Sequence, residues 1–241
     1  MPLQNVASAQ QLKNFLKDNR HYSFYNFPGL QEEAIYDFPD VNSAENGLVA
    51  IGGNLSFGTL INAYRKGIFP WFNPGEVIQW FSPDPRFVLF PEKLKISHSM
   101  RNVLNKHQFK FTFDSAFADV ITNCRTVRRG KETESWIGNE IVHAYHNLFK
   151  KGVAHSAEAW ENNELVGGLY GVLLGKVFFG ESMFAIKSNA SKFAFINWVN
   201  TLRNNGIELI DCQVYTSHLE SLGAEFIPGK EFNGLLEKWI P

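Results

Sequence analysis

The sequence predicts a mixed α/β (α+β) fold, with a small N-terminal domain over residues 1–84 and a larger domain over residues 85–241. Strand and helix patterns alternate from residue 86 onward, which is typical of proteins with helices packed on a sheet. Residues 155–184 have the pattern of an antiparallel meander, so we expect a mixed, largely antiparallel sheet. A proline-rich segment, residues 68–86, separates the two parts.

The N-terminal part offers few regular elements. Residues 8–20 have a helical pattern, with Ser8 as a candidate N-cap. The apolar run 47–56 ends in Asn-Leu-Ser, which is suited to cap a helix over 59–67. Segment 68–86 carries four prolines among five aromatic residues. Proline interrupts helices and central strands, so we interpret this segment as a rigid loop between the two domains.

The larger domain is expected to consist of alternating strands and helices. The expected strands are 86–94, 109–115, three within 155–184 and 208–214. The expected helices are 97–107, 115–126, 139–152, 189–206 and a short one over 218–223. The turns of the meander fall at Asn162-Asn163 and Gly175-Lys176, where residues that tolerate positive φ are found.

Composition excludes several classes of protein. The formal net charge is -1, so a polyanion would have to be bound by a local basic patch. Cys124 and Cys212 are too few for a disulfide framework, which suits a reducing compartment. The sequence contains no apolar run long enough to span a membrane and no secretory signal. We therefore expect a cytoplasmic protein without a membrane partner.

No common cofactor motif is present. The sequence lacks a P-loop, a Gly-x-Gly-x-x-Gly turn before a helix, an H-E-x-x-H motif and paired cysteines, which argues against ATP, dinucleotide and zinc chemistry. The meander followed by a helix over 155–206 is similar to acetyltransferase-like (GNAT-like) folds. The turn before that helix reads AIKSNASK, without the glycines that would cradle coenzyme A. We expect neither an organic cofactor nor a metal.

The candidate chemistry centres on three polar residues within apolar runs. Asp211 and Gln213 are two apart in LIDCQV, so an extended strand would place them on one face. One interpretation is that the two residues act as a pair that takes up a proton. The alternative is that the Asp211 carboxylate only accepts hydrogen bonds from the backbone at the end of a strand. Glu181 in FFGESMF is a second such acid, and its alternative is a salt bridge in the core.

Aromatic and basic residues suggest a nucleic-acid partner. The aromatic residues near glycine- and proline-rich loops are Tyr64, Trp71, Trp80, Phe81 and Trp136. They are either loop anchors or platforms that stack on nucleobases. Basic residues recur at Arg101, Lys106, Lys110, Arg125, Arg128, Arg129 and Lys131. They form either a solvated face or a track for phosphates.

Several motifs occur together in order between residues 47 and 228. They are GLVAIGGNLS, AYRKGIFPWF, FSPDPR, HSAEAW, LVGGLYG, FFGESMF, NASK, LIDCQV and HLESLGAEFIP. In this combination the chain resembles the leucyl/phenylalanyl-tRNA–protein transferase family. The resemblance implies a small N-terminal α+β domain and an acetyltransferase-like domain. It also implies transfer of leucine or phenylalanine from aminoacyl-tRNA to proteins that begin with arginine or lysine, which marks them for N-end rule degradation in bacteria.

The resemblance also implies roles for individual residues. Asp211 and Gln213 would be catalytic, and Glu181, Trp71 and Trp136 would bind the aminoacyl-adenosine end. We expect Tyr64 at the same end and an apolar pocket of Leu169, Phe184 and Trp198 for the leucine or phenylalanine side chain. The expected phosphate contacts are Arg101, Lys106, Arg128 and Arg129.

The chain departs from the family pattern at four positions. His98 and Gly229 stand where arginine is usual, Phe81 where a second tryptophan is common and Leu169 where some members have methionine. Few cationic positions remain, so tRNA affinity should depend only weakly on salt. Two alternatives stay open: a coenzyme A-dependent N-acetyltransferase and a non-catalytic RNA-binding module. We expect the protein to act as a monomer.

Overall fold

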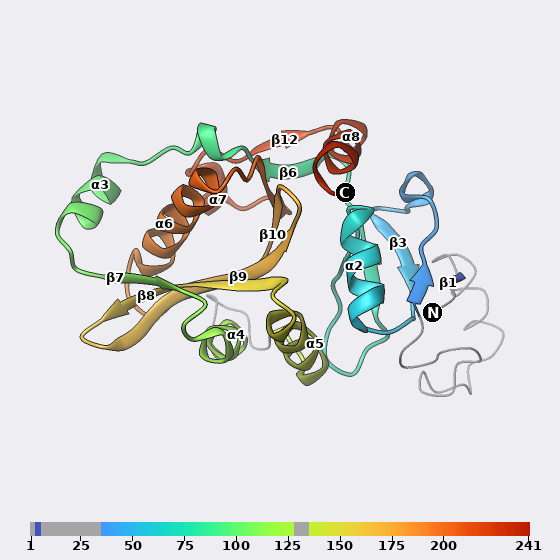
Figure 1. Cartoon of the computed structure of the whole chain (residues 1–241), viewed down its shortest axis with the longest axis horizontal. Coiled ribbons are helices and arrows are strands. Elements are labelled where there is room, and N and C mark those ends of the chain that lie inside the picture. The colour runs from blue at the N-terminus through green and yellow to red at the C-terminus, as the bar shows by residue number, and fades with distance from the viewer. Residues whose placement is uncertain (1–2, 6–34, 128–134) are drawn as a thin grey trace.

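The computed structural model of the chain describes residues 3–5, 35–127 and 135–241. The predicted helix over 8–20 lies outside these residues, as do Arg128 and Arg129. The described residues form three sheets with helices around them, which confirms the mixed α/β fold class (Figure 1). The first sheet is a parallel pair of short strands, β1 (Leu3–Asn5) and β2 (Ile35–Asp37).

The second sheet and one helix make up the rest of the N-terminal part. The sheet has the order β3-β5-β4 and is antiparallel; its strands are β3 (Leu48–Ile51), β4 (Phe69–Pro70) and β5 (Gln79–Phe81). Helix α2 (Phe57–Arg65) begins after Ser56, whose side chain accepts a hydrogen bond from the backbone N–H of Thr59. The predicted helix over 59–67 is therefore confirmed, shifted by two residues toward the N-terminus. A 3-10 turn, η2 (Val41–Ser43), precedes the sheet.

The expectation that 68–86 is a loop without strands is wrong. Both β4 and β5 lie within it, and β5 is the central strand of its sheet. The physical reason is the placement of the prolines. Pro74 and Pro83 flank β5 without entering it, and Pro70 lies in β4, an edge strand that does not need every N–H for pairing.

The third sheet has seven strands in the order β12-β6-β11-β10-β9-β8-β7. Its strands are β6 (Arg86–Leu89), β7 (Lys110–Phe113), β8 (Ala154–Glu161), β9 (Glu164–Leu174), β10 (Val177–Ala185), β11 (Leu209–Gln213) and β12 (Glu225–Ile227). Only β10 and β11 pair in parallel, so the prediction of a mixed, largely antiparallel sheet is confirmed. The β8–β9 turn contains Asn162 and Asn163, both at positive φ, as predicted.

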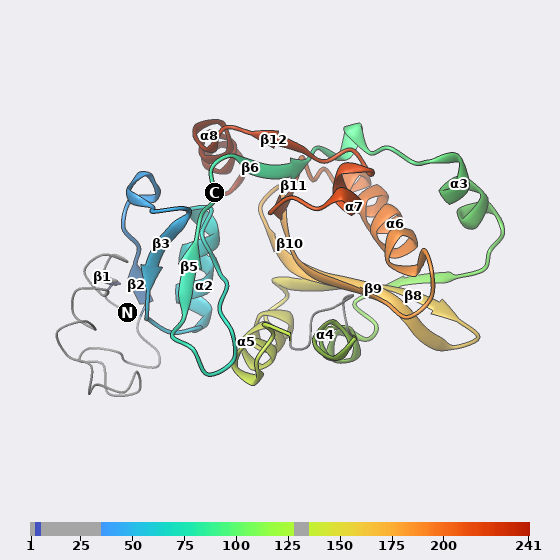
Figure 2. The ribbon, with the colours of Figure 1, turned by 180° about the vertical axis from the view of Figure 1, so that it is seen from behind.

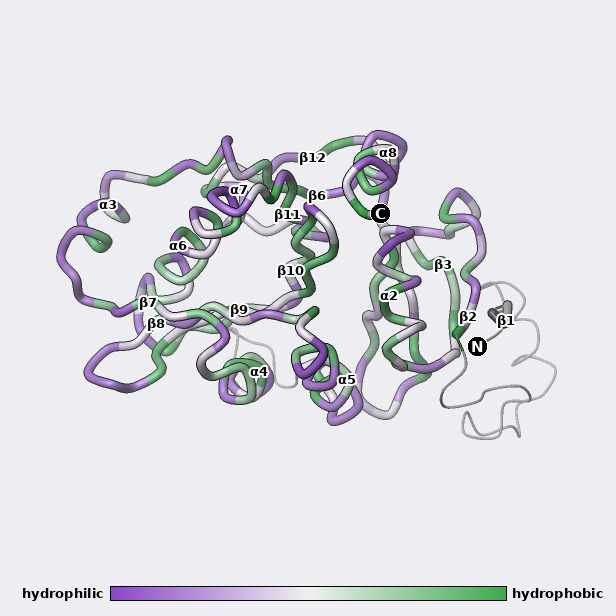
Figure 3. The backbone as a smooth tube through the Cα atoms, in the orientation of Figure 1, coloured by the Kyte–Doolittle hydropathy of each residue, from purple (hydrophilic) through white to green (hydrophobic). Residues whose placement is uncertain are grey.

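Helices cover both faces of this sheet (Figures 1 and 2). Helix α6 (Ala190–Asn204) packs on one face, and α4 (Phe117–Thr126) and α5 (Asn139–Lys150) pack on the other. The remaining elements are α3 (His98–Asn105), α7 (Ser217–Glu220), α8 (Gly229–Trp239) and a 3-10 turn, η3 (Pro91–Lys93). Hydrophobic residues follow the strands, whereas α4 and α5 turn hydrophilic residues away from the sheet (Figure 3).

The two parts of the chain share one apolar core. Residues of the small sheet and α2 pack in the same cluster as residues of β10, α5 and α8. The end of the chain returns to α2, where Nη2 of Arg65 donates a hydrogen bond to the carbonyl of Pro241 at 2.6 Å. The division at residue 84 remains a prediction, because the core is continuous across it. No helix in the described part of the chain is long and apolar enough to cross a membrane.

Candidate active site

A cavity of about 370 Å³ opens where β10 and β11 stop pairing. The parallel register ends at Phe179 and Asp211, and each strand has a bulge just beyond, between Gly180 and Ser182 in β10 and before Gln213 in β11. Bulges bend a strand away from its neighbour and re-aim its side chains. The divergence of two adjacent strands therefore creates a space at the centre of the sheet. Its lining is mostly apolar, with Glu181, Asp211 and Gln213 among the polar residues.

Asp211 forms a buried ion pair. Its carboxylate is fully buried and accepts hydrogen bonds from Nε and Nη2 of Arg86 at 2.8 and 2.7 Å. The guanidinium group lies between the rings of Phe69 and Phe232, 4.9 and 4.6 Å from their centroids. Two parallel hydrogen bonds of this kind fix both partners in one orientation. The pair therefore holds the end of β11 rigidly against β6.

Gln213 does not follow the alternation of an extended strand. A bulge precedes it and its φ is +64°, in the left-handed region, so the same-face argument from spacing does not apply. Its backbone N–H donates to Oδ1 of Asp211 at 2.9 Å, and its side-chain Nε2 donates to Oε1 of Glu181 at 3.0 Å. Its amide oxygen accepts no hydrogen bond from any residue that the structure describes. Asp211 thus holds the backbone of Gln213 in place, and the amide oxygen of Gln213 remains available to accept a hydrogen bond from a ligand.

Glu181 joins the two parts of the chain. Its Oε1 accepts a hydrogen bond from the hydroxyl of Tyr64 at 2.7 Å, and its Oε2 accepts one from Tyr145 at 2.8 Å. The two hydroxyls also contact each other. Burial raises the pKa of Glu181 to about 7, against the hydrogen bonds from Tyr64, Tyr145 and Gln213, which lower it. Within the described residues Glu181 forms no ion pair, so the core salt bridge considered for it is not observed.

The five candidate aromatic residues separate into two groups. Trp71, which is 43% exposed, and Trp136 line the cavity, and Phe81 supports Trp71 edge-on with ring centroids 5.6 Å apart. Trp80 is fully buried and its Nε1 donates to the carbonyl of Gly52, so it is a loop anchor. Tyr64 is also fully buried, which excludes the stacking considered for its ring. Its contribution to the site is the hydroxyl on Glu181.

The structure does not bring the three residues of the expected side-chain pocket together at the cavity. Leu169 lines the cavity, but Phe184 and Trp198 do not. Phe184 packs with α4 and α5 on one face of the sheet. Trp198 lies on α6 at the other face, where the centroid of its ring is 5.5 Å from that of Phe178. The apolar lining near Leu169 is provided by residues that sequence reasoning did not single out: Phe178, Met183, Phe195, Ile210 and Leu219.

Sequence reasoning also missed Arg86 and Tyr145. Arg86 begins the apolar strand RFVL, and an arginine inside such a run was the available signal that a buried carboxylate pairs with it. Tyr145 gave no signal, because its position fits the buried face of a helix.

The expected phosphate contacts are not brought together with the cavity. Arg101 and Lys106 are exposed on and just after α3, which lies at the far end of the molecule from α2 (Figures 1 and 2). Arg128 and Arg129 lie outside the described residues. Their contacts with tRNA therefore stay a prediction.

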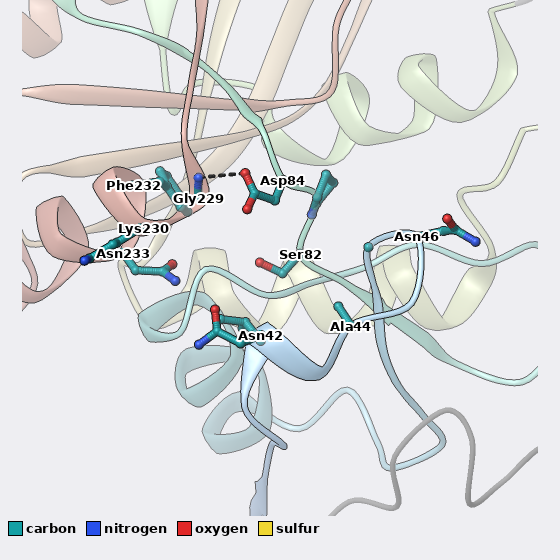
Figure 4. A pocket seen from close by; sticks show the side chains of 12 residues that line it. Asn42, Ala44, Asn46, Ser82, Asp84, Gly229, Lys230, Phe232 and Asn233 are labelled. Carbon is teal, nitrogen blue, oxygen red and sulfur yellow. Dashed lines mark hydrogen bonds between the residues drawn. The ribbon is translucent and has the colours of Figure 1, made fainter.

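A second hollow, of about 490 Å³, lies between the start of α8 and the loops around residues 41–47 and 82–84 (Figure 4). Oδ1 of Asp84 accepts a hydrogen bond from the backbone N–H of Gly229 at 2.8 Å. The carboxylate thus occupies the helix terminus at which an anion would otherwise bind. In the described part of the chain no cluster of three or more His, Cys, Asp or Glu residues could hold a metal ion.

Comparison with known proteins gives a consistent result. Two family profiles match the chain: the leucyl/phenylalanyl-tRNA protein transferase over residues 88–237 and the N-terminal domain of the same transferase over 53–84. A leucyl/phenylalanyl-tRNA–protein transferase of Syntrophobacter fumaroxidans is 52% identical over 88% of this chain and 90% of its own length. The one of Christiangramia forsetii is 54% identical over 81% of this chain and 93% of its own.

Two solved structures are distantly similar to the chain. A functionally unknown conserved protein from Staphylococcus epidermidis has a TM-score of 0.47 and 7% identity, over 93% of this chain and 79% of its own. A GCN5-related N-acetyltransferase from Kribbella flavida has a TM-score of 0.36 and 8% identity, over 72% of this chain and 61% of its own.

Proposed function

The chain belongs to the leucyl/phenylalanyl-tRNA–protein transferase family, and from this premise we propose that it moves leucine or phenylalanine from tRNA to the α-amine of proteins that begin with arginine or lysine. Membership makes the chain an aminoacyltransferase, so the coenzyme A-dependent acetyltransferase and the non-catalytic RNA-binding module are set aside. The new N-terminal residue would mark the acceptor for N-end rule degradation in the cytoplasm. Cys124 and Cys212 are both buried, and we propose that the enzyme acts as a monomer.

The observation that carries this proposal is the arrangement of Gln213 and Glu181 in the cavity. Gln213 offers an unused amide oxygen, and the neighbouring Glu181 has a pKa of about 7. An amine nucleophile needs a hydrogen-bond acceptor to orient it and a group that takes its proton near neutral pH. The two side chains supply these two requirements side by side.

The donor ester fits the remainder of the cavity. We propose that the terminal adenine stacks on Trp71 and Trp136 and that the leucine or phenylalanine side chain enters the apolar part near Leu169 and Phe178. An apolar pocket of this kind separates side chains that differ by one methylene by about 10- to 200-fold. The reactive carbonyl would then lie between the aromatic and apolar parts, close to Glu181.

The reaction needs little beyond positioning and one proton acceptor. An α-amino group has a reference pKa of about 7.7–8.0, so a fraction is already neutral at physiological pH. In our proposal the amine donates a hydrogen bond to the amide oxygen of Gln213 and attacks the ester carbonyl. Glu181 accepts the proton that the new C–N bond displaces and returns it to the ribose oxygen as the C–O bond breaks. Asp211 acts through Gln213, since its buried carboxylate forms an ion pair with Arg86 and accepts a hydrogen bond from the backbone N–H of Gln213.

The test is a transfer assay with the full-length chain. Radiolabelled leucyl-tRNA or phenylalanyl-tRNA is incubated with peptides that differ only in their first residue. We expect labelled product with arginine and lysine peptides and none when the same peptides carry an acetylated N-terminus. Failure to label any basic-headed peptide would contradict the proposed acceptor, and labelling of the acetylated peptides would contradict attack by the α-amine.

Removing one aromatic ring should weaken donor binding. We expect Trp71→Ala to raise the KM for leucyl-tRNA about 10- to 100-fold, because base stacking on an aromatic ring contributes about 1–3 kcal/mol. The KM for the acceptor peptide should stay unchanged. Phe113→Ala is the matched control, since Phe113 is 51% exposed but does not line the cavity. An equal effect of both substitutions on the KM for leucyl-tRNA would argue against stacking on Trp71.

A further inference from the structure

Two large aromatic side chains lie exposed next to the cavity. Tyr215 is 49% and Phe226 is 52% exposed, and their rings are nearly parallel, with an interplanar angle of 17° and centroids 6.0 Å apart. Both rings pack on Phe87, which is buried, with centroids 5.4 and 4.8 Å away. A pair of half-exposed rings on a fixed support is typical of a surface that binds a ligand. We call these two residues the aromatic pair.

The strand register places the aromatic pair close to Gln213. On β6, Phe87 is in register with Gln213 of β11 on one side and with Phe226 of β12 on the other. Adjacent strands are about 4.8 Å apart, so the Phe226 backbone lies about 10 Å from that of Gln213. Tyr215 follows Gln213 by two residues and is at most about 7 Å away along the chain.

The segment that carries Tyr215 also forms part of the cavity wall. Val214 and Thr216, on either side of Tyr215, line the cavity, whereas Tyr215 itself does not. The aromatic pair therefore lies beside the cavity, within two residues or two strands of Gln213. A group bound there would be near the nucleophile.

A carboxylate sits at the edge of the aromatic pair. Oε2 of Glu220 accepts a hydrogen bond from the hydroxyl of Tyr215 at 2.8 Å, and Glu220 is exposed. No cation pairs with Glu220 in the described part of the chain, whereas the nearby Glu225 is paired with Lys93. An unneutralised carboxylate repels phosphate groups and attracts cations. Aromatic faces also attract cations, and a guanidinium group stacks on them.

We propose that Tyr215, Phe226 and Glu220 form the site that binds the cationic side chain of the acceptor's first residue while its α-amine contacts Gln213. This inference rests on the function proposed above and deepens it, since it names the residues that select arginine and lysine. The rings contact the flat or methylene part of the side chain, and Glu220 pairs with its charge. A polyanionic tRNA strand is disfavoured at the same place by that charge.

The test is a steady-state transfer assay that measures the KM for the acceptor peptide and the KM for leucyl-tRNA separately. We expect Tyr215→Leu to raise the KM for an arginine-initial peptide about 5- to 30-fold and Glu220→Gln to raise it about 2- to 5-fold, with the KM for leucyl-tRNA unchanged in both. Tyr215→Phe keeps the aromatic ring, so its KM for the peptide should stay close to the wild-type value. In Glu220→Gln, the KM for the peptide should also lose most of its dependence on salt. Glu164→Gln, an exposed acid at the β8–β9 turn, is the matched control and should change neither KM.

The possible outcomes distinguish a failure of this acceptor-site inference from a failure of the proposed transfer function. If the wild-type protein labels basic-headed peptides but both variants keep its KM for them, the inference is overturned and the proposed function stands. If the variants instead raise the KM for leucyl-tRNA, the aromatic pair contacts the donor and the inference is also overturned. Thermal unfolding of each variant excludes a general loss of structure. Absence of transfer by the wild-type protein would overturn the proposed function itself.

Discussion

Replacing Asp211 by alanine is expected to abolish transfer and to lower the free energy of unfolding by about 3–5 kcal/mol. The stability loss arises because Arg86 would remain buried between two aromatic rings without a counter-charge. The loss of transfer arises because the backbone N–H of Gln213 would lose its acceptor and the strained, left-handed residue would move. Chemical denaturation and the transfer assay measure the two effects.

A double substitution separates the loss of function from the loss of stability. Replacing both charges with apolar residues of similar size, as in Arg86→Met with Asp211→Leu, removes the unpaired charge, and such exchanges are often neutral or stabilising. We expect this variant to unfold close to the wild-type temperature and to bind leucyl-tRNA, yet still to transfer nothing. Transfer at near wild-type rate by the double variant would show that Asp211 does not position Gln213.

The parts of the fold that could be predicted are those with local signals. The three strands of the β8–β9–β10 meander were predicted from alternation and from turn residues, and Asn162 and Asn163 indeed adopt positive φ. Helices α3, α5 and α6 each begin or end with recognisable cap or turn residues, such as Ser97 before α3, Gly152 after α5 and Gly206 after α6. These signals depend on a few neighbouring residues and survive in any tertiary context.

The errors have different physical origins. Strand β12 is three residues long, too short for periodicity to indicate it. Helix α8 was not predicted, although Phe232, Leu235 and Leu236 form an apolar stripe along it. In β5, proline density was used as a regional average, although only the position of each proline within a strand matters.

Sequence patterns single out polar residues of the candidate site but not the contacts between them. The structure brings Gln213 and Glu181 into hydrogen-bond contact, and the ion pair of Asp211 with Arg86 joins residues 125 positions apart, which no local pattern encodes. Spacing placed Asp211 and Gln213 on one face, whereas a bulge separates them. Periodicity shows that Leu169, Phe184 and Trp198 are buried, but it cannot show which buried face borders a cavity that two diverging strands create.

Changing Glu181 to glutamine is expected to lower kcat/KM for transfer by about 10²- to 10⁴-fold, the usual contribution of a positioned proton acceptor. Only the ionised carboxylate can take a proton, and burial raises its pKa to about 7. Wild-type activity should therefore rise with pH through about 7, in addition to any rise near 8 from the acceptor amine. In Glu181→Gln the rise near 7 should disappear and only the rise near 8 should remain.

Tyr64→Phe tests the same assignment by shifting the transition instead of removing it. The hydroxyl of Tyr64 donates a hydrogen bond to Glu181 and thereby lowers the pKa of that carboxyl group. Without this bond the pKa should rise, so the activity transition near pH 7 should move to higher pH, because more alkaline conditions are then needed to ionise Glu181. The phenylalanine keeps the buried ring packed against Phe179, so the fold should be retained, as thermal unfolding would show. A transition that stays near pH 7 in both variants would belong to another group, and Glu181 would not be the proton acceptor.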